Sequence, residues 1–211
     1  MIFLGSARDS TPPRPARLGA RVAAACLRIV TARSQAAQII DPLDFELAGV
    51  FKPHFAYAND KAPQPLDELA EAIASADGYI MVSPEYNHAM SPALAHLLNH
   101  FGASRFAFKP SGIMTYSAGQ WGGARAAMSM RGFLSELGCL PVSAMVHIPK
   151  AQEALSEDGT WATDPDAWDS YLGRTLTQLD WWAEAAKRQH GQGDAKSTEP
   201  FGKDPSQRNA P

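Results

Sequence analysis

A short apolar run, residues 78–82, followed by Ser83-Pro84-Glu85-Tyr86-Asn87-His88, constrains the fold of this chain more than any other feature. The run is rich in β-formers and predicts a buried strand, and the proline predicts a turn directly after it. A helical pattern follows, so this turn is a loop at the carboxyl end of a strand. Open α/β sheets bind their ligands at that edge.

Two other loops have the same position relative to an apolar run. Residues 5–8 follow the run 2–4, and the glycine-rich residues 117–123 follow the run 113–116. Because parallel strands end at one edge of a sheet, the three loops are expected to surround a single ligand.

Hydrophobic periodicity predicts alternating strands and helices along the chain. The predicted strands cover residues 2–4, 36–40, 78–82, 111–116 and 140–148. The predicted helices cover residues 18–31, 66–76, 92–101, 122–137 and 164–189, with Ser91 and Asp164 as N-caps before a proline. This alternation predicts an α/β fold, a doubly wound five-stranded parallel sheet with helices on both faces.

The remaining segments are predicted from composition. Residues 42–65 are rich in proline and aromatic residues without a period, which indicates a long ordered loop. Residues 190–211 hold one large apolar side chain and are expected to form a disordered tail after a single domain, residues 1–189.

Charge and cysteine content narrow the class of protein. The net charge is −3 and the basic residues are scattered, which argues against nucleic acid as a partner. No apolar stretch approaches the roughly 18–20 residues of a membrane span. Cys26 and Cys139 lie in or beside apolar helical patterns, which favours buried reduced thiols and a cytoplasmic protein.

The first loop has the chemistry of an anion site. Gly5, the Ser6 hydroxyl and the forked guanidinium of Arg8 precede a helix N-terminus, whose amides and dipole favour a phosphate monoester. Residues 11–16 intervene before the helix and could move the phosphate contacts to Arg17 or Gly19. The alternative is a simple tight turn with a surface arginine.

The second and third loops suit a flat heteroaromatic ligand. Pro84 fixes one backbone angle and Asn87 tolerates unusual ones, so free amides can project toward such a ring. Glu85 and His88 can also be interpreted as an acid/base pair, or as ordinary surface residues. In the third loop, Ser117 supplies a hydrogen-bonding group and the glycines allow close backbone approach.

These three motifs resemble those of the NADPH-dependent FMN reductase family, flavodoxin-like flavoproteins that include quinone, chromate and azo-dye reductases. The matching residues are Gly-Ser-x-Arg at 5–8, Pro-Glu-Tyr-Asn-His at 84–88, and Ser117-x-Gly119 followed by two glycines. The likeness runs from about residue 1 to 147. It implies a flavodoxin-like sheet with strand order 2-1-3-4-5.

The resemblance also implies site residues. Ser6 and Arg8 would hold the FMN phosphate, with Arg17 or Gly19 helping. Pro84, Glu85, Tyr86 and Asn87 would line the isoalloxazine ring, Ser117 and Gly119 would flank flavin and ribityl, and Tyr86 and His88 would stand at the exposed flavin face. No catalytic side chain and no metal are expected.

The implied activity is an FMN-dependent NAD(P)H oxidoreductase that reduces flavin, quinone or similar small acceptors by ping-pong hydride transfer, because the cofactor carries the difficult chemistry. NADPH or NADH would be the donor, and a homodimer or homotetramer the assembly. The helix that follows the second loop departs from the family pattern at Leu94-Ala95-His96 and Asn99.

Other functions stay open at this point. The chain could be an FMN-binding electron carrier or a redox-regulated protein-interaction module without reductase turnover. A hydrolase would need a nucleophile elbow of the G-x-S-x-G type, which is absent. His96 and His100 have a helical spacing that can chelate zinc, but two polar residues at a helix surface or interface explain the same pattern.

Overall fold

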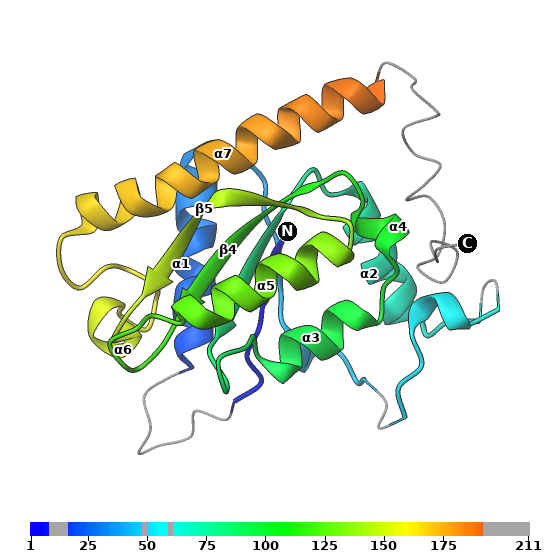
Figure 1. Cartoon of the computed structure of the whole chain (residues 1–211), viewed down its shortest axis with the longest axis horizontal. Helices are drawn as coiled ribbons and strands as arrows, with labels where there is room; N and C mark the ends of the chain where they lie inside the picture. The colour runs from blue at the N-terminus through cyan, green and yellow to red at the C-terminus, as the bar shows by residue number, and fades with distance from the viewer. Residues whose placement is uncertain (9–16, 48–49, 59–60, 192–211) are drawn as a thin grey trace.

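The structure is a computed structural model, and it describes residues 1–8, 17–47, 50–58 and 61–191. Five parallel strands form one sheet in the order β2-β1-β3-β4-β5, as predicted (Figure 1). The strands are β1 (Ile2–Leu4), β2 (Ile39–Ile40), β3 (Tyr79–Pro84), β4 (Pro110–Tyr116) and β5 (Leu140–Ile148). Every strand pair is parallel, so all the strands end at one edge.

Helices cover both faces of this sheet (Figure 1). The longer helices are α1 (Leu18–Ala32), α2 (Gln64–Ser75), α3 (Pro92–Asn99), α5 (Ala124–Glu136) and α7 (Pro165–Gly191). Two short ones are α4 (Ala103–Phe106) and α6 (Ala151–Ala154), and two 3₁₀ turns are η1 (Pro42–Asp44) and η2 (His54–Ala56). None of the helices in the described part of the chain combines the length and apolar character needed to span a membrane.

Alternation along the strands divides the core into two layers. On β1, Ile2 and Leu4 pack with the buried faces of α1 and α7, whereas Phe3 packs with α2, α3 and α5. On β3, Ile80 belongs to the first layer and Met81 to the second. Strands buried on both faces have no polar alternation, which is why they appear in the sequence as continuous apolar runs.

The N-caps of two helices follow their sequence signals. Ser91 accepts hydrogen bonds from the amides of Ala93 (3.1 Å) and Leu94 (3.4 Å), and Pro92 occupies the first position of α3. Asp164 Oδ1 accepts from the amide of Ala167 at 3.4 Å at the start of α7. A side-chain acceptor satisfies amides that have no partner inside the helix.

Several predicted boundaries were wrong. The second strand was expected at 36–40, but only Ile39 and Ile40 pair with β1, which is itself three residues long. The third strand continues through Ser83 and Pro84, which pair with β4 after β1 has ended at Leu4. The missing N–H of Pro84 therefore removes no bond to β1.

Two helix predictions also needed correction. The helix expected from residue 122 begins at Ala124, because Gly122 and Gly123 have positive φ angles of 58° and 79°. The helix expected at 92–101 ends at Asn99, and α4 follows it. Two segments with predictions, residues 11–16 and 192–211, lie outside the described residues, and α7 extends two residues beyond the predicted domain end at 189.

Candidate functional site

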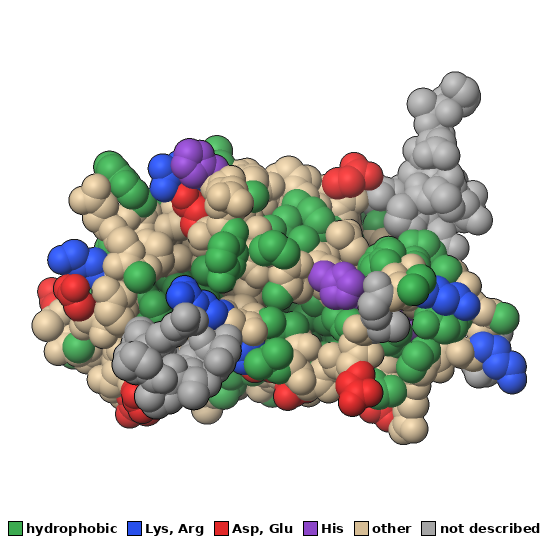
Figure 2. Space-filling model, turned by 90° about the horizontal axis from the view of Figure 1, so that it is seen from below, with side chains coloured by type: hydrophobic (Ala, Val, Ile, Leu, Met, Phe, Trp, Pro, Cys, Tyr) green, Lys and Arg blue, Asp and Glu red, His purple; other side chains and the backbone are tan. Residues whose placement is uncertain are grey.

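The three loops singled out in the sequence follow adjacent strands of the sheet. Leu4, Val82 and Met114 are neighbours across β1, β3 and β4, so the loops that begin just beyond them share the carboxyl edge. Figure 2 shows the molecule from below Figure 1, where hydrophobic side chains are interspersed with Lys and Arg side chains. The topology therefore brings residues 5–8, 84–90 and 117–123 to one edge.

The first loop is fixed to the sheet by its backbone. The amide of Gly5 donates to the carbonyl oxygen of Val82 at 2.7 Å. A Cβ on Gly5 would lie 2.4 Å from that oxygen, so only glycine allows this approach. Ser6 is buried and its Oγ accepts from the amide of Arg8 at 3.4 Å, while the Arg8 side chain is exposed. One buried hydroxyl and one exposed guanidinium thus stand at the end of β1.

Arg17 and Gly19 stand at the start of α1. The Arg17 guanidinium binds the Asp41 carboxylate through both of its terminal nitrogens, with NH2 at 3.0 Å from Oδ1. Gly19 packs against the first loop, because a Cβ there would lie 3.1 Å from the Ser6 Cβ. The structure therefore brings Gly19 beside Ser6, and it directs the fork of Arg17 to Asp41.

The second loop is a two-residue hairpin. Tyr86 donates its amide to the Ala89 carbonyl at 3.0 Å, and the Ala89 amide returns a bond of 2.9 Å. Asn87 and His88, the residues between them, have φ angles of 49° and 64°. Such consecutive left-handed residues define a type I′ turn, which is strained for His88, and the Tyr86 side chain beside it is 41% exposed.

Glu85 pairs with Arg125 in the structure. Its Oε1 accepts from Arg125 Nε at 2.7 Å, and its Oε2 accepts from the amides of Arg125 (3.2 Å) and Ala126 (3.4 Å) at the start of α5. Burial raises the pKa of this carboxyl, but the bonds from Arg125 and Ala126 outweigh it and the net pKa is lowered. Glu85 thus fastens the second loop to α5 as an anionic N-terminal cap.

The third loop is ordered by a serine and two glycines. Ser117 Oγ donates to the Gly119 carbonyl (2.9 Å) and accepts from the Gly122 amide (3.0 Å). A Cβ on Gly122 would lie 2.9 Å from the Ile148 amide nitrogen, and one on Gly123 would lie 2.8 Å from the Thr115 Cβ. Gly119 differs, because no heavy atom lies within 4 Å of its Cβ position. Backbone at Gly119 is therefore open to a ligand.

Nothing in the sequence signals the roles of Arg125, Asp41 and Tyr116. Arg125 and Asp41 bind partners 40 and 24 residues away, so no local pattern connects them. Tyr116 has a buried side chain whose hydroxyl oxygen would lie 2.6 Å from a Cβ on Gly19. Such contacts exist only once the parallel sheet has assembled.

The two cysteines are free and buried, as expected. Burial raises the pKa of both thiols to about 12, so neither is a nucleophile at neutral pH. His96 and His100 lie with ring centroids 5.0 Å apart, and Phe51 packs against both rings. Within the described ranges, no group of three or more His, Cys, Asp or Glu side chains could hold a metal ion.

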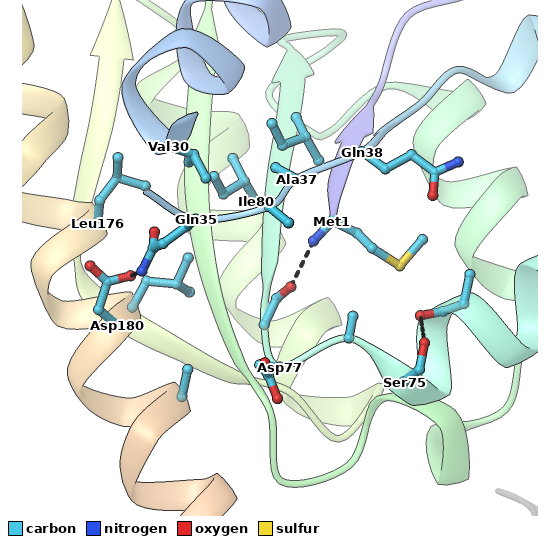
Figure 3. Close-up of a pocket in the computed structure, with 17 residues that line it drawn as sticks. Met1, Val30, Gln35, Ala37, Gln38, Ser75, Asp77, Ile80, Leu176 and Asp180 are labelled. Carbon is cyan, nitrogen blue, oxygen red and sulfur yellow. Dashed lines mark hydrogen bonds between the residues drawn. The ribbon is translucent and has the colours of Figure 1, made fainter. Parts of the chain in front are cut away.

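A separate cavity of about 580 Å³ lies at the opposite, amino-terminal edge of the sheet (Figure 3). Met1, Gln35, Asp77 and Asp180 are among the residues that line it. Several polar groups of this lining have partners: Gln35 Nε2 donates to Asp180 Oδ1 at 2.9 Å, and Asp77 lies 3.4 Å from the Lys187 ammonium. It shares no residue with the three loops.

Comparison with known proteins supplies further observations. A family model described as NADPH-dependent FMN reductase matches residues 2–153. An NAD(P)H-dependent FMN reductase of Pseudomonas aeruginosa is 33% identical over 108 residues, which are 48% of this chain and 57% of that protein. A quinone reductase of Escherichia coli is 37% identical over 75 residues, 34% of this chain and 40% of that protein. The matched regions thus span about half the length of these curated relatives.

The fold also resembles a solved structure. FerB, a flavoenzyme NAD(P)H:acceptor oxidoreductase from Paracoccus denitrificans, superimposes with a TM-score of 0.64 at 20% identity, over 87% of this chain and 96% of that one. At this identity the likeness concerns the fold, a flavodoxin-like sheet.

Proposed function

The chain belongs to the NADPH-dependent FMN reductase family, and we propose that it is an FMN-dependent NAD(P)H oxidoreductase that reduces quinones or similar small acceptors. The observation that carries this proposal is the meeting of three loops at the carboxyl edge of β1, β3 and β4. Relatives named as FMN reductase and quinone reductase support the same activity class.

The residues at this edge fit FMN. Ser6 and Arg8 offer a hydroxyl and a guanidinium for the phosphate, next to the first-turn amides of α1. We assign Arg17 a supporting part, because Asp41 already occupies its guanidinium. Gly19 lets the first turn of α1 come close to Ser6.

The residues proposed around the isoalloxazine ring also fit FMN. The rigid backbone of Pro84, Glu85, Tyr86 and Asn87 lines one side of the proposed ring site, and Ser117 and Gly119 lie along the flavin and ribityl chain. Gly119 has open space where a side chain would begin, which supports close approach of a ligand. Tyr86 and His88 lie on an exposed hairpin, and we propose that they border the face on which donor and acceptor bind in turn.

FMN, when bound, supplies the hydride chemistry in two half-reactions that share one face, and the protein supplies binding and orientation. Glu85 holds the second loop against α5 and is fully engaged as an acceptor, so it positions the loop and transfers no proton. Trp121, 63% exposed on the third loop, can shield the same edge from water.

The proposal extends to assembly and location. Trp121 on the third loop, Met128 on α5, and Trp181 and Trp182 on α7 are large hydrophobic side chains that are exposed. These side chains support a homodimer or homotetramer. The two buried reduced thiols are consistent with a cytoplasmic protein, and residues 1–189 are proposed as one FMN-binding domain.

One experiment tests the activity. The purified protein is loaded with FMN and titrated without oxygen, in parallel with NADPH and with NADH, while the visible flavin absorbance is followed. Loss of the flavin band with either donor, and its return on adding a quinone, is the expected result. Bound flavin that neither donor bleaches would instead identify an electron carrier, and failure to bind FMN would refute the proposal altogether.

A further inference from the structure

A buried tyrosine joins two of the three loops to helix α1. Tyr116 is the last residue of β4, paired with Pro84 on β3 and Ile148 on β5, and its side chain is 4% exposed. It belongs to the core layer on the α1 side of the sheet. The residue that follows it, Ser117, begins the third loop, so Tyr116 lies at the root of the site.

The tip of this phenol reaches the first loop. A Cβ on Gly19 would lie 2.6 Å from Tyr116 Oη and 3.1 Å from the Ser6 Cβ, so the phenol, Ser6 and the first turn of α1 converge on one point. Gly19 has an ordinary backbone conformation, since it is not among the residues with positive φ. Its lack of a side chain is therefore explained by the space that the Tyr116 hydroxyl occupies.

The hydroxyl acts as a neutral hydrogen-bonding group. Burial raises the pKa of the Tyr116 phenol to about 12, although the neighbouring Ser6 side chain and the charges of Arg17 and Arg8 lower it. The phenol therefore stays protonated at neutral pH. A serine hydroxyl rotates freely when it has no fixed neighbour, and a buried hydrogen-bonding partner restricts that rotation.

We propose that Tyr116 is a positioning residue of the phosphate site: its buried phenol, wedged between the first loop and α1, fixes the Ser6 hydroxyl to receive the phosphate group of FMN. This inference rests on the proposed function, because it assigns a specific end of FMN to Ser6. The orientation of Ser6 matters more in this chain because Asp41 binds the Arg17 guanidinium and leaves Arg8 as the exposed cation of the first loop.

The test compares two flavins that differ only in the phosphate. Dissociation constants of FMN and riboflavin are measured with the apoprotein by quenching of flavin fluorescence, for the wild type and for Tyr116→Phe. The variant keeps the ring and removes the hydroxyl. If the phenol holds the Ser6 hydroxyl in place, its removal predicts about tenfold weaker FMN binding, with riboflavin binding changed less than about twofold.

Tyr79→Phe is the matched control. Tyr79 is also fully buried, and its hydroxyl donates to the Ile73 carbonyl at 2.8 Å, outside the three loops. This variant loses a buried hydroxyl in the same way, so it reports the general effect of the substitution on stability. Its ratio of FMN to riboflavin affinity is expected to equal that of the wild type.

A second variant, Ser6→Ala, tests the same contact from its other side. It is expected to weaken FMN selectively, as Tyr116→Phe does, and the double variant is expected to lose less than the product of the two single losses because they share one contact. Equal weakening of both flavins by Tyr116→Phe, or no weakening, overturns the positioning role while leaving the proposed function intact. A wild type that binds neither flavin overturns both.

Discussion

Gly5 and Gly119 belong to the same proposed site, but the structure predicts opposite outcomes when each is replaced by alanine. At Gly5 the new Cβ would lie 2.4 Å from the Val82 carbonyl oxygen and 3.1 Å from the Leu94 Cβ. Real Cβ atoms essentially never lie closer than 3.0 Å to another heavy atom. The first loop and β3 would therefore have to move apart by at least about 0.6 Å, and both are backbone segments that resist such a shift. At Gly119 no heavy atom lies within 4 Å, and φ is not positive.

The cost at Gly5 can be worked from two effects. Overpacking against the β3 backbone costs about 1–3 kcal/mol. Weakening the 2.7 Å bond from the Gly5 amide to Val82 costs about 0.5–1.5 kcal/mol more. The free energy of unfolding should therefore fall by about 3 kcal/mol and the melting temperature by roughly 10 °C for a chain of this size.

Urea and thermal unfolding of the apoproteins, followed by circular dichroism, measure this difference. Gly119→Ala should unfold within about 0.5 kcal/mol of the wild type. Gly5→Ala should also bind FMN more weakly, since the first loop moves with the clash. If both variants unfold within about 1 kcal/mol of each other, the close approach of Gly5 to Val82 is not a structural constraint.

Three further predictions concern charge and protonation. Arg8→Ala should weaken FMN binding about tenfold with unchanged unfolding, whereas Arg17→Ala should lower stability through its bond to Asp41, both measured by flavin titration and urea unfolding. Glu85→Gln should cost about 1–2 kcal/mol of stability, and the Glu85 contribution to the wild type should disappear as pH falls through its lowered pKa, which urea unfolding below pH 5 measures. Burial and His96 lower the pKa of His100, so below about pH 6.5 the unfolded chain binds more protons than the folded one. The free energy of unfolding should therefore fall as pH drops below about 6.5, and it should fall less steeply in His100→Phe, as urea unfolding over this pH range measures.

Most of the fold was predictable because the central strands are buried on both faces. Runs such as 2–4 and 79–82 are continuous apolar segments between helical periods, and that pattern specifies parallel strands. β5 differs, because its burial alternates along the strand. The short elements were not predictable. Helices α4 and α6 have four residues each, fewer than two turns, so they leave no period in the sequence.

The site was predictable as a set of loops, but not as a set of contacts. Asn87 signalled a left-handed residue, yet His88 beside it gave no such signal because its φ of 64° is imposed by the hairpin bonds between Tyr86 and Ala89. Arg17 appeared available for phosphate, and its bond to Asp41 depends on how α1 and the end of β2 come together. A local sequence motif indicates the backbone geometry of its loop, whereas the ionic partner of a side chain depends on the assembled fold.

A crystal structure of the protein grown with FMN tests the central claim most directly, because that claim is a location. The account predicts the phosphate beside Ser6 and Arg8 and the ring between the 84–88 hairpin and Gly119, at the carboxyl edge of the sheet. Flavin bound in the cavity at the amino-terminal edge, beside Asp77 and Gln35, or a carboxyl edge that stays free of flavin at saturating concentration, would contradict it.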